Sequence, residues 1–193
     1  MSLQQFLFKN RGLLLGLPAA ALATFGRPSS SSIALGLPLA IAGELLRCWA
    51  VGYAGVTTRD DRVTAPGLVT AGPYAYVRNP LYLGNFITAA GFAIAFTGRN
   101  SRAARRGLIG GSLLAMAALY GAIVPHEEEY LRSQFGEEFD WYCERVPRFV
   151  PQLEPLPDGR GEWDPQALVA AESKTFATFG AMLAALAVRA RRP

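Results

Sequence analysis

The chain has 193 residues, of which 51% are hydrophobic and 18% are charged, and its formal net charge is +4. An intrinsically disordered chain is excluded, because such chains are poorer in apolar residues and richer in charge. The small basic excess excludes a nucleic-acid-binding class, since no stretch combines clustered Lys and Arg with a soluble fold. The acids are unevenly placed: twelve of the fifteen lie between Glu127 and Glu172. A long apolar part therefore precedes a polar, acidic part.

Five apolar runs follow one another along the chain. They cover residues 12–25, 33–56, 81–98, 107–124 and 176–188. The run 33–56 is long enough to cross a bilayer core of about 30 Å at about 1.5 Å per helical residue. All five are rich in Gly and Ala and nearly free of charge, which favours packed membrane helices over a soluble core, whose helices keep a charged face. The last run is short, so it either spans the bilayer, lies at its interface or packs on the bundle.

The first run follows Lys9 and Arg11, as the core of a signal peptide would. The further apolar runs favour a retained membrane helix instead. Cys48 lies in an apolar run and Cys143 in the acidic part, so two reduced thiols are expected rather than a disulfide. The single histidine, His126, has no second His and no Cys nearby, so no metal site is expected.

The polar connections carry clear turn and helix signals. Asn79-Pro80 predicts a helix start, with Asn79 as N-cap and Pro80 at the first helical position. After the fourth run we expect a short helix over 127–135, a stop at Gly136 and a second helix to about Arg145. Proline and glycine then mark a loose connector to the last helix.

We therefore expect one all-α domain over residues 1–193. It is a polytopic membrane helical bundle of about five transmembrane helices, with a short helical cap at one membrane face. Its expected parts are the first two helices (12–56), a loop (57–80), a helical hairpin (81–124), capping helices (125–151), and a linker with the C-terminal helix (152–193).

Glu44 and Arg47 are the first candidates for chemistry. They lie within the run 33–56, three residues apart and so on one helix face. Charges at such depth are costly and usually face protein or a wet cavity. Two interpretations are open: the two side chains form an ion pair that helps the helices assemble, or they form a site for a polar headgroup. The cost of placing charge inside the membrane favours the second interpretation.

The loop-to-helix segment before the third run offers a second candidate site. A helix N-terminus presents backbone N–H groups, which suit anionic or polar ligands. Tyr74, Tyr76 and Tyr82 either stack on a purine or form an interfacial aromatic belt. The triplet Glu127-Glu128-Glu129 is a third candidate, because carboxylates suit ribose hydroxyls or a cationic group, and acids in a first helical turn also suit the helix dipole. Most of the later acids are expected on solvated helix faces and in the linker, and Asp60 and Asp61 are expected as ordinary loop charges.

The segment LVTAGPYAYVRNPLYLG is followed by an apolar hairpin and then by EEEYLRSQFGEEFDWYCERVPRFVP. These ordered motifs resemble the isoprenylcysteine carboxyl methyltransferases and phospholipid methyltransferases, which are integral-membrane enzymes that use S-adenosylmethionine. The similarity covers about residues 43–151. It implies methyl transfer from S-adenosylmethionine to a lipid-like or prenylated small acceptor, with the cofactor pocket on the cytoplasmic face of the membrane.

The resemblance also implies individual roles. The implied cofactor-binding residues are Gly67, Leu68, Val69, Tyr74, Arg78, Asn79, Pro80, Leu81, Tyr82 and Glu127. Arg47, in a Gly-Glu-x-x-Arg segment, is implied to act at the substrate, with Glu44 as its partner or as the base that accepts a proton from an amine. Asn79 replaces the commoner His of the motif. Ile123 stands where the isoprenylcysteine enzymes carry a substrate-binding Arg, which counts against a prenylcysteine carboxylate.

Two other classes of function stay open. Sterol reductases resemble the same membrane core and use NADPH, but they are usually longer than this chain. A non-enzymatic membrane protein would bind no cofactor, and the ordered cofactor motif counts against it. The acceptor group (carboxylate, amine or thiol), the orientation in the membrane and the oligomeric state are not determined by the sequence.

Overall fold

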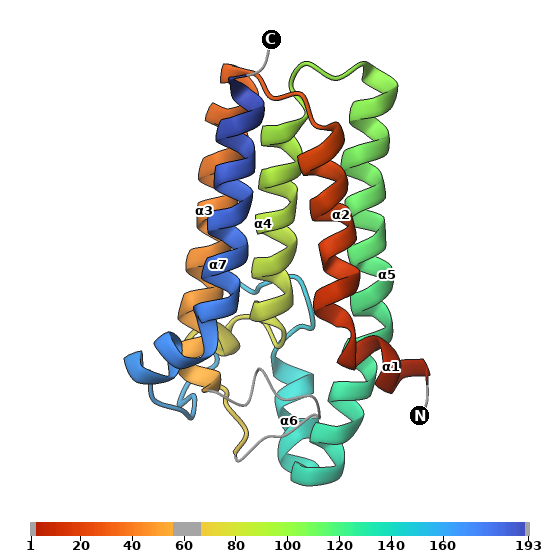
Figure 1. Cartoon of the computed structure of the whole chain (residues 1–193). Coiled ribbons are helices and arrows are strands. Elements are labelled where there is room, and N and C mark those ends of the chain that lie inside the picture. The colour runs from red at the N-terminus through yellow and green to blue at the C-terminus, as the bar shows by residue number, and fades with distance from the viewer. Residues whose placement is uncertain (1–2, 56–66, 192–193) are drawn as a thin grey trace.

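The computed structural model describes residues 3–55 and 67–191, and in this part of the chain every regular element is a helix. The elements are α1 (Leu3–Lys9), α2 (Arg11–Phe25), α3 (Ser30–Ala54), the 3₁₀ helix η2 (Gly72–Ala75), α4 (Pro80–Phe96), α5 (Arg102–Phe135), α6 (Glu137–Arg145) and α7 (Pro165–Ala190). Five of them, α2, α3, α4, α5 and α7, run side by side as a bundle (Figure 1). The all-α prediction is confirmed.

Among the described residues, two helices are long and apolar enough to cross a membrane, by length and composition. They are α3, with 25 residues, and α5, with 34. The apolar helices α2 and α4 are shorter, with 15 and 17 residues. At about 1.5 Å per residue these two rise only about 22–26 Å, less than a hydrocarbon core of about 30 Å. The long apolar helices support a membrane protein, and a bundle of five spans stays a prediction.

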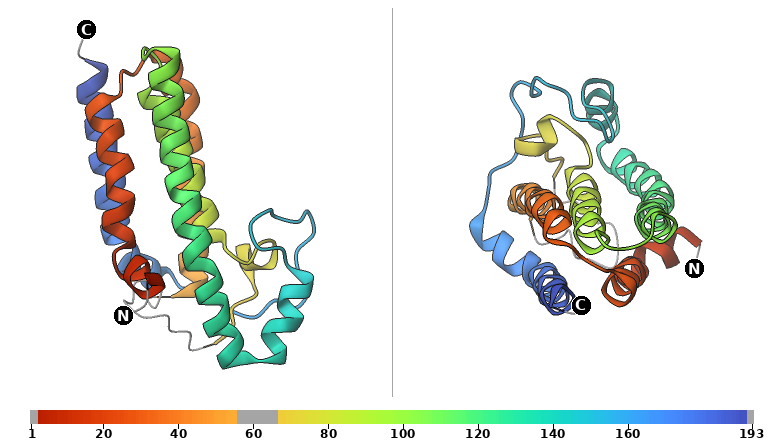
Figure 2. Two further views of the ribbon diagram at one scale, coloured as in Figure 1. Left: turned by 90° about the vertical axis from the view of Figure 1, so that its right-hand side faces the viewer. Right: turned by 90° about the horizontal axis from the view of Figure 1, so that it is seen from above.

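The polar elements gather at one end of the bundle, as the left-hand view of Figure 2 shows. They are the loop 67–79 with η2, helix α6 and the connector 146–164, and we call them together the cap. Its apolar core consists of Ala75, Phe139, Tyr142, Val146 and Leu156. Helices α3, α5 and α7 enter or leave the cap at this same end, so residues far apart in sequence meet there.

Helix α5 differs from its prediction. Separate helices were expected over 107–124 and 127–135, and this expectation is wrong because α5 runs without a break through Pro125. A proline lacks the N–H that would bond the carbonyl four residues earlier, and its ring crowds that carbonyl. That earlier residue is Gly121, and no side chain or neighbouring element lies within 4 Å of a Cβ added there, so no other part of the described chain crowds this turn of the helix. The predicted stop at Gly136 is confirmed, with a φ of 52° that favours glycine.

Helix α7 begins much earlier than the apolar run 176–188 indicated. It starts at Pro165, and the Asp164 side chain accepts the N–H of Gln166 at 2.8 Å. This is the same Asx-Pro helix start as Asn79-Pro80. The Asp164 N–H also donates to the Gly52 carbonyl of α3 at 2.8 Å. The polar first half of α7 is thereby held against the bundle instead of forming a loose connector.

The backbones of α3 and α4 approach each other closely. A Cβ added to Gly36 would lie 2.4 Å from the Gly91 carbonyl oxygen, and one added to Gly91 would lie 2.3 Å from the Ala40 nitrogen. One added to Gly43 would lie 2.7 Å from the Gly84 carbonyl oxygen. Membrane helices use small residues in this way to pack backbone on backbone. The contact fixes α4 relative to the α3 face that carries Arg47.

Replacing Gly91 by alanine is expected to lower the melting temperature, because the new methyl group collides with the α3 backbone. Overpacking of this kind costs about 1–3 kcal/mol of folding free energy. The matched control is Gly110→Ala on α5, where no atom lies within 4 Å of the added Cβ. There the exchange is expected to be neutral or slightly stabilising. Thermal unfolding in detergent measures both, and equal melting temperatures would contradict the close approach of α3 and α4.

Candidate active site

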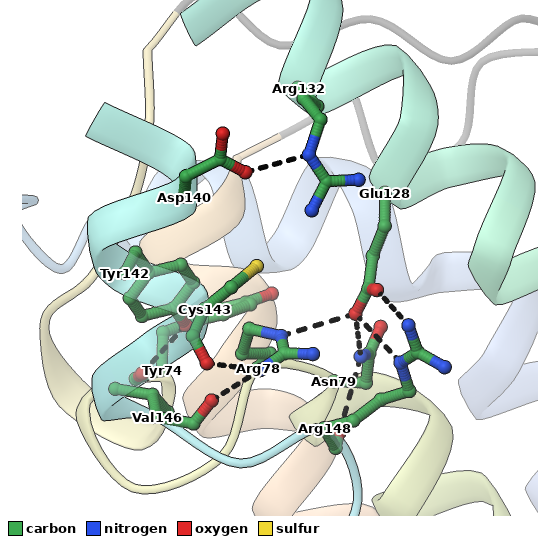
Figure 3. A network of polar contacts seen from close by, with 10 residues as sticks. All are labelled: Tyr74, Arg78, Asn79, Glu128, Arg132, Asp140, Tyr142, Cys143, Val146 and Arg148. Atoms are coloured by element: carbon green, nitrogen blue, oxygen red, sulfur yellow. Dashed lines mark hydrogen bonds and ion pairs between the residues drawn. The ribbon is translucent and has the colours of Figure 1, made fainter. Parts of the chain in front are cut away.

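Glu128 of α5 ties the loop before α4 to the segment after α6 (Figure 3). Its Oε1 accepts from Arg78 Nε at 3.1 Å and from Arg148 Nε at 3.2 Å, and its Oε2 accepts from Arg148 Nη2 at 2.5 Å. The residue is only 5% exposed. A carboxylate buried to this extent requires such compensation, since an unpaired buried charge is very costly. Glu128 is therefore an exception to the expectation that most of the later acids are solvated, whereas the neighbouring Glu129 is exposed as expected.

Arg78 and Asn79, both implied as cofactor residues, hold the cap together in this structure (Figure 3). Arg78 Nη1 donates to the carbonyls of Cys143 at 3.0 Å and Val146 at 2.5 Å, where α6 ends and its last carbonyls need donors. Asn79 stands at the N-cap position of α4, but its side chain makes no capping bond. Its amide instead donates to the Arg148 carbonyl at 3.2 Å.

Two tyrosines join η2 to α6. The Tyr142 hydroxyl donates to the Tyr74 carbonyl at 2.8 Å. Burial raises the pKa of both phenols, so both stay protonated. The carboxylate of Glu127 raises the pKa of Tyr74 further, and the guanidinium of Arg47 lowers it. The Tyr74 side chain therefore lies within electrostatic reach of both predicted functional groups.

Tyr82 and Glu127 contact each other directly, as the resemblance would require of two residues in one site. The Tyr82 hydroxyl donates to Glu127 Oε1 at 2.6 Å, across α4 and α5. The Tyr82 ring packs on the ring of Tyr120, with 4.5 Å between centroids and 51° between planes. A carboxylate and two aromatic faces thus stand beside the start of α4.

Arg47 has a richer set of partners than the sequence indicated. Its Nη2 donates to both carboxylate oxygens of Glu172 on α7, at 2.8 and 3.0 Å. Its Nη1 donates to Asn85 Oδ1 at 2.6 Å. Glu44 Oε2 lies 3.7 Å from Arg47 Nε, an ion-pair distance but longer than a hydrogen bond. The interpretation as a pair of Glu44 and Arg47 alone was therefore incomplete.

The two groups of contacts lie next to each other along α4. Asn85 follows Tyr82 by three residues, so the two side chains share a helix face. The polar contacts therefore involve four helices. Arg47 on α3 contacts Glu172 on α7 and Asn85 on α4. Tyr82, also on α4, contacts Glu127 on α5. This row of polar side chains, lying just inside the cap, is the candidate active site.

The remaining predicted residues lie in two places. Pro80 is buried in the first turn of α4 and Leu81 is half-buried beside it. Leu68 packs on the apolar core of the cap, and Val69 lies near Gly161 of the connector. Gly67 is an exposed bend. The segment 67–69 thus belongs to the outer part of the cap, while Asp60 and Asp61 lie outside the described residues.

Sequence reasoning missed Asn85, Arg148 and Glu172, and it named Glu128 only as a member of the triplet 127–129, without its arginine partners. For Glu172 a signal was present, because Asp164-Pro165 is a helix start of the kind recognised at residues 79–80. That start places Glu172 inside α7 and not in a linker. For Glu128 the sequence offered only an acidic triplet.

A cavity of 1060 Å³ opens on the outer side of the cap, between α6 and residues 152–160. Of the predicted site residues, only Leu68 lines it. The cavity is thus separate from the row of polar side chains between Glu172 and Glu127. Its position argues against it as the place where Arg47 acts.

In the described residues, long apolar helices carry a polar cap at one end, which supports a membrane protein, and comparison with known proteins gives the family. The chain belongs to the phospholipid methyltransferase family, which matches residues 31–138. The resemblance drawn from the motifs is thereby confirmed. Helix α7 lies beyond the matched residues. No solved structure matches the chain.

Several curated proteins are similar to the chain. A nickel-cobalt-cadmium resistance protein of Alcaligenes xylosoxydans xylosoxydans is 34% identical over 135 residues, covering 70% of this chain and 52% of that protein. A cobalt-zinc-cadmium resistance protein of Cupriavidus metallidurans is 36% identical over 129 residues (67% and 51%). Protein-S-isoprenylcysteine O-methyltransferase B of Arabidopsis thaliana is 31% identical over 120 residues (60% and 57%). The chain spans about half the length of these relatives.

Proposed function

We propose that the protein transfers a methyl group from S-adenosylmethionine to a lipid-like acceptor at the membrane face. The observation that carries the proposal is the meeting of motif residues at the start of α4, where Tyr82 donates to Glu127 at 2.6 Å. Membership of the phospholipid methyltransferase family supports it. So does the name of the Arabidopsis relative, which is an isoprenylcysteine methyltransferase.

The residues beside α4 fit S-adenosylmethionine by their chemistry. Glu127 offers a carboxylate for hydroxyl or amino groups, and the ring of Tyr82, held in place by the buried Tyr120, offers a flat apolar surface. The Asn79 side chain is drawn away into the cap, so it does not occupy the first N–H groups of α4, which suit polar ligand groups. When bound, S-adenosylmethionine supplies a methyl group carried on a positively charged sulfur.

The acceptor site is proposed at Arg47 and Glu44. Methyl transfer requires that the acceptor be aligned within about 3–3.5 Å of the methyl group in a site with little water. A guanidinium carries five N–H donors, so Arg47 keeps a donor beyond those given to Glu172 and Asn85 with which to orient an acceptor carboxylate. For an amine acceptor, Glu44 accepts the proton, because the amine must be neutral to attack. Ile123 is fully buried among apolar side chains, so its position offers no charge to a prenylcysteine carboxylate.

The arrangement in the membrane is part of the proposal. Five helices (α2, α3, α4, α5 and α7) span the bilayer, and the cap lies at the cytoplasmic face. A charged, water-soluble donor then reaches the start of α4 from the aqueous side, while a lipophilic acceptor enters from the bilayer. The apolar outer faces of α3 and α5 support this placement.

Ligand binding separates the proposal from its rivals. S-adenosylhomocysteine, the demethylated product, is expected to raise the melting temperature of the purified protein, and NADPH is expected to leave it unchanged. Stabilisation by NADPH alone would support a reductase, and the absence of any shift would support a non-enzymatic protein. Two relatives are named for metal resistance, but the described residues contain no group of three or more His, Cys, Asp or Glu side chains able to hold a metal ion.

Glu127→Gln is expected to raise the dissociation constant for S-adenosylhomocysteine about tenfold or more. A hydrogen bond to a charged group is worth about 1.5–3 kcal/mol, and about 1.4 kcal/mol corresponds to a factor of ten. The matched control is Glu129→Gln, which removes an exposed carboxylate two residues further along the same helix. Isothermal titration measures both variants. Equal affinities in the two variants would remove Glu127 from the cofactor site.

A further inference from the structure

We infer that Glu172 on α7 is a positioning residue for Arg47, so that α7, outside the family-matched residues 31–138, completes the active site. The inference rests on the proposed function, because it concerns the orientation of the arginine that faces the acceptor. It assigns a role to an acid that lies outside both sequence motifs.

The contact between these two side chains is close and buried. Both oxygens of Glu172 accept from Arg47 Nη2, at 2.8 and 3.0 Å. Glu172 is 0% exposed and Arg47 is 7% exposed. Thr175, one turn further along α7, places its Oγ1 at 3.4 Å from the same nitrogen. Helix α7 therefore presents two side chains to one end of the guanidinium.

The rest of the arginine is held by α4. A Cβ on Gly84 would lie 2.7 Å from Arg47 Cγ, so the stem of the side chain lies against bare backbone. Nη1 donates to Asn85 at 2.6 Å, on the opposite side of the fork from Glu172. Because a guanidinium is planar, partners on both terminal nitrogens fix its plane as well as its position. Glu172 supplies the α7 side of this clamp.

The connector 146–164 fixes the position of α7 along α3, and therefore the position of Glu172 relative to Arg47. The Asp164 N–H donates to the Gly52 carbonyl at the cap end of α3. The indole of Trp163 lies so close to Gly52 that a Cβ there would collide with it. Both contacts fix the start of α7 on the helix that carries Arg47. The alignment of Glu172 with Arg47 is thus built into the fold and does not depend on the side chains alone.

This clamp has a consequence for catalysis. A reacting group displaced by about 1 Å can lose about 100-fold in rate, even when the change is made away from the reacting atoms. Without the Glu172 charge, the Arg47 guanidinium keeps its stem contact but loses the partner that directs Nη2. We therefore expect turnover to fall while binding of the donor, on the α5 side of α4, is unchanged. A purely structural ion pair would lower stability and leave turnover per folded molecule unaffected.

The test is a double-mutant cycle with Glu172→Gln, Arg47→Gln and the double variant, in which kcat, the acceptor KM, the dissociation constant for S-adenosylhomocysteine and the melting temperature are measured. Glu172→Gln is expected to lower kcat about 100-fold with unchanged donor binding. In the Arg47→Gln background the same change is expected to lower kcat less than about twofold, because the residue acts through Arg47. Lys174→Gln, which removes an exposed charge from the same helix, is the control.

A wild-type kcat in Glu172→Gln, or an equal loss in both backgrounds, would overturn the inference. If Glu172→Gln does not fold, Thr175→Ala decides, since it removes the neighbouring contact on Nη2. This variant is expected to lose kcat several-fold at an unchanged melting temperature, and an unchanged kcat would overturn the inference. An inactive wild-type protein is a different result, because it would overturn the proposed function and this inference with it.

Discussion

Replacing Arg47 by alanine is expected to lower the rate of methyl transfer at least about 100-fold and to lower the free energy of unfolding by about 3–5 kcal/mol. The stability loss follows from Glu172, which is fully buried and would lose the guanidinium that contacts both of its oxygens. Removing one partner of a buried ion pair costs this much because a buried charge is left behind. The loss of turnover follows from the proposed role of Arg47 in orienting the acceptor.

Two further variants separate charge from geometry. Arg47→Lys keeps a positive charge near Glu172 but loses the planar fork, so it is expected to recover stability and not turnover. Arg105→Ala, at an exposed position near the start of α5, is the control for loss of an arginine. Turnover and thermal unfolding are measured for all three. Near-wild-type turnover in Arg47→Ala, with donor binding intact, would contradict the role of Arg47 at the acceptor.

Replacing Glu128 by alanine is expected to release the cap from the bundle. Arg78 and Arg148 both lose their shared carboxylate, and the Arg78 side chain is buried. The expected cost is about 3–5 kcal/mol, and it falls on the cap because the contacts among α2, α3 and α4 are untouched. Since the cap encloses the start of α4, donor binding is expected to be lost as well.

Limited proteolysis checks this prediction, because an undocked cap exposes α6 and the connector to cleavage while the bundle stays resistant. The control is Asp140→Ala, which removes the carboxylate of the half-exposed pair with Arg132 on the same cap. Exposed pairs contribute about 0–1 kcal/mol, so little change is expected there. A Glu128→Ala protein with normal protease resistance and normal donor affinity would show that Glu128 does not hold the cap.

The sequence predicts the helices well where the signal is local. The apolar runs 33–56 and 81–98 correspond to α3 and α4, and Asn79-Pro80 marks a true helix start. The break expected after residue 124 failed because proline only disfavours a helix locally, and the surrounding turns carry α5 through it. The start of α7 was placed too late because hydropathy was given more weight than the Asp164-Pro165 signal.

The candidate site was predictable only in part. Tyr82 and Glu127 belong to two motifs, and both lie in the site. Glu172 is 125 residues from Arg47 in sequence, and no local pattern links them. Their contact depends on the connector that fixes α7 on α3, which is a tertiary feature. The sequence therefore predicted Glu172, one of twelve acids in a polar segment, to be solvated, although it is among the most buried charged residues in the described chain.

The motif residues also have a structural meaning that a family pattern does not state. Arg78 satisfies the last carbonyls of α6, and the Asn79 amide donates to the carbonyl of Arg148. Both side chains thus shape the cap around the start of α4, where the donor is proposed to bind. Such a residue can affect cofactor binding without touching the cofactor, because it holds in place the segments that surround the proposed binding site.

The most direct test of the proposed function is transfer of radiolabelled methyl groups from S-adenosylmethionine by the purified full chain. Host membrane lipids and a short prenylcysteine are offered side by side, with Arg47→Ala as the negative control. We predict label in the lipid fraction with the wild-type protein and at least about 100-fold less label with the variant. Label in neither acceptor, from a protein that binds S-adenosylhomocysteine, would contradict a lipid-like acceptor, and label in prenylcysteine alone would contradict the argument from the buried Ile123.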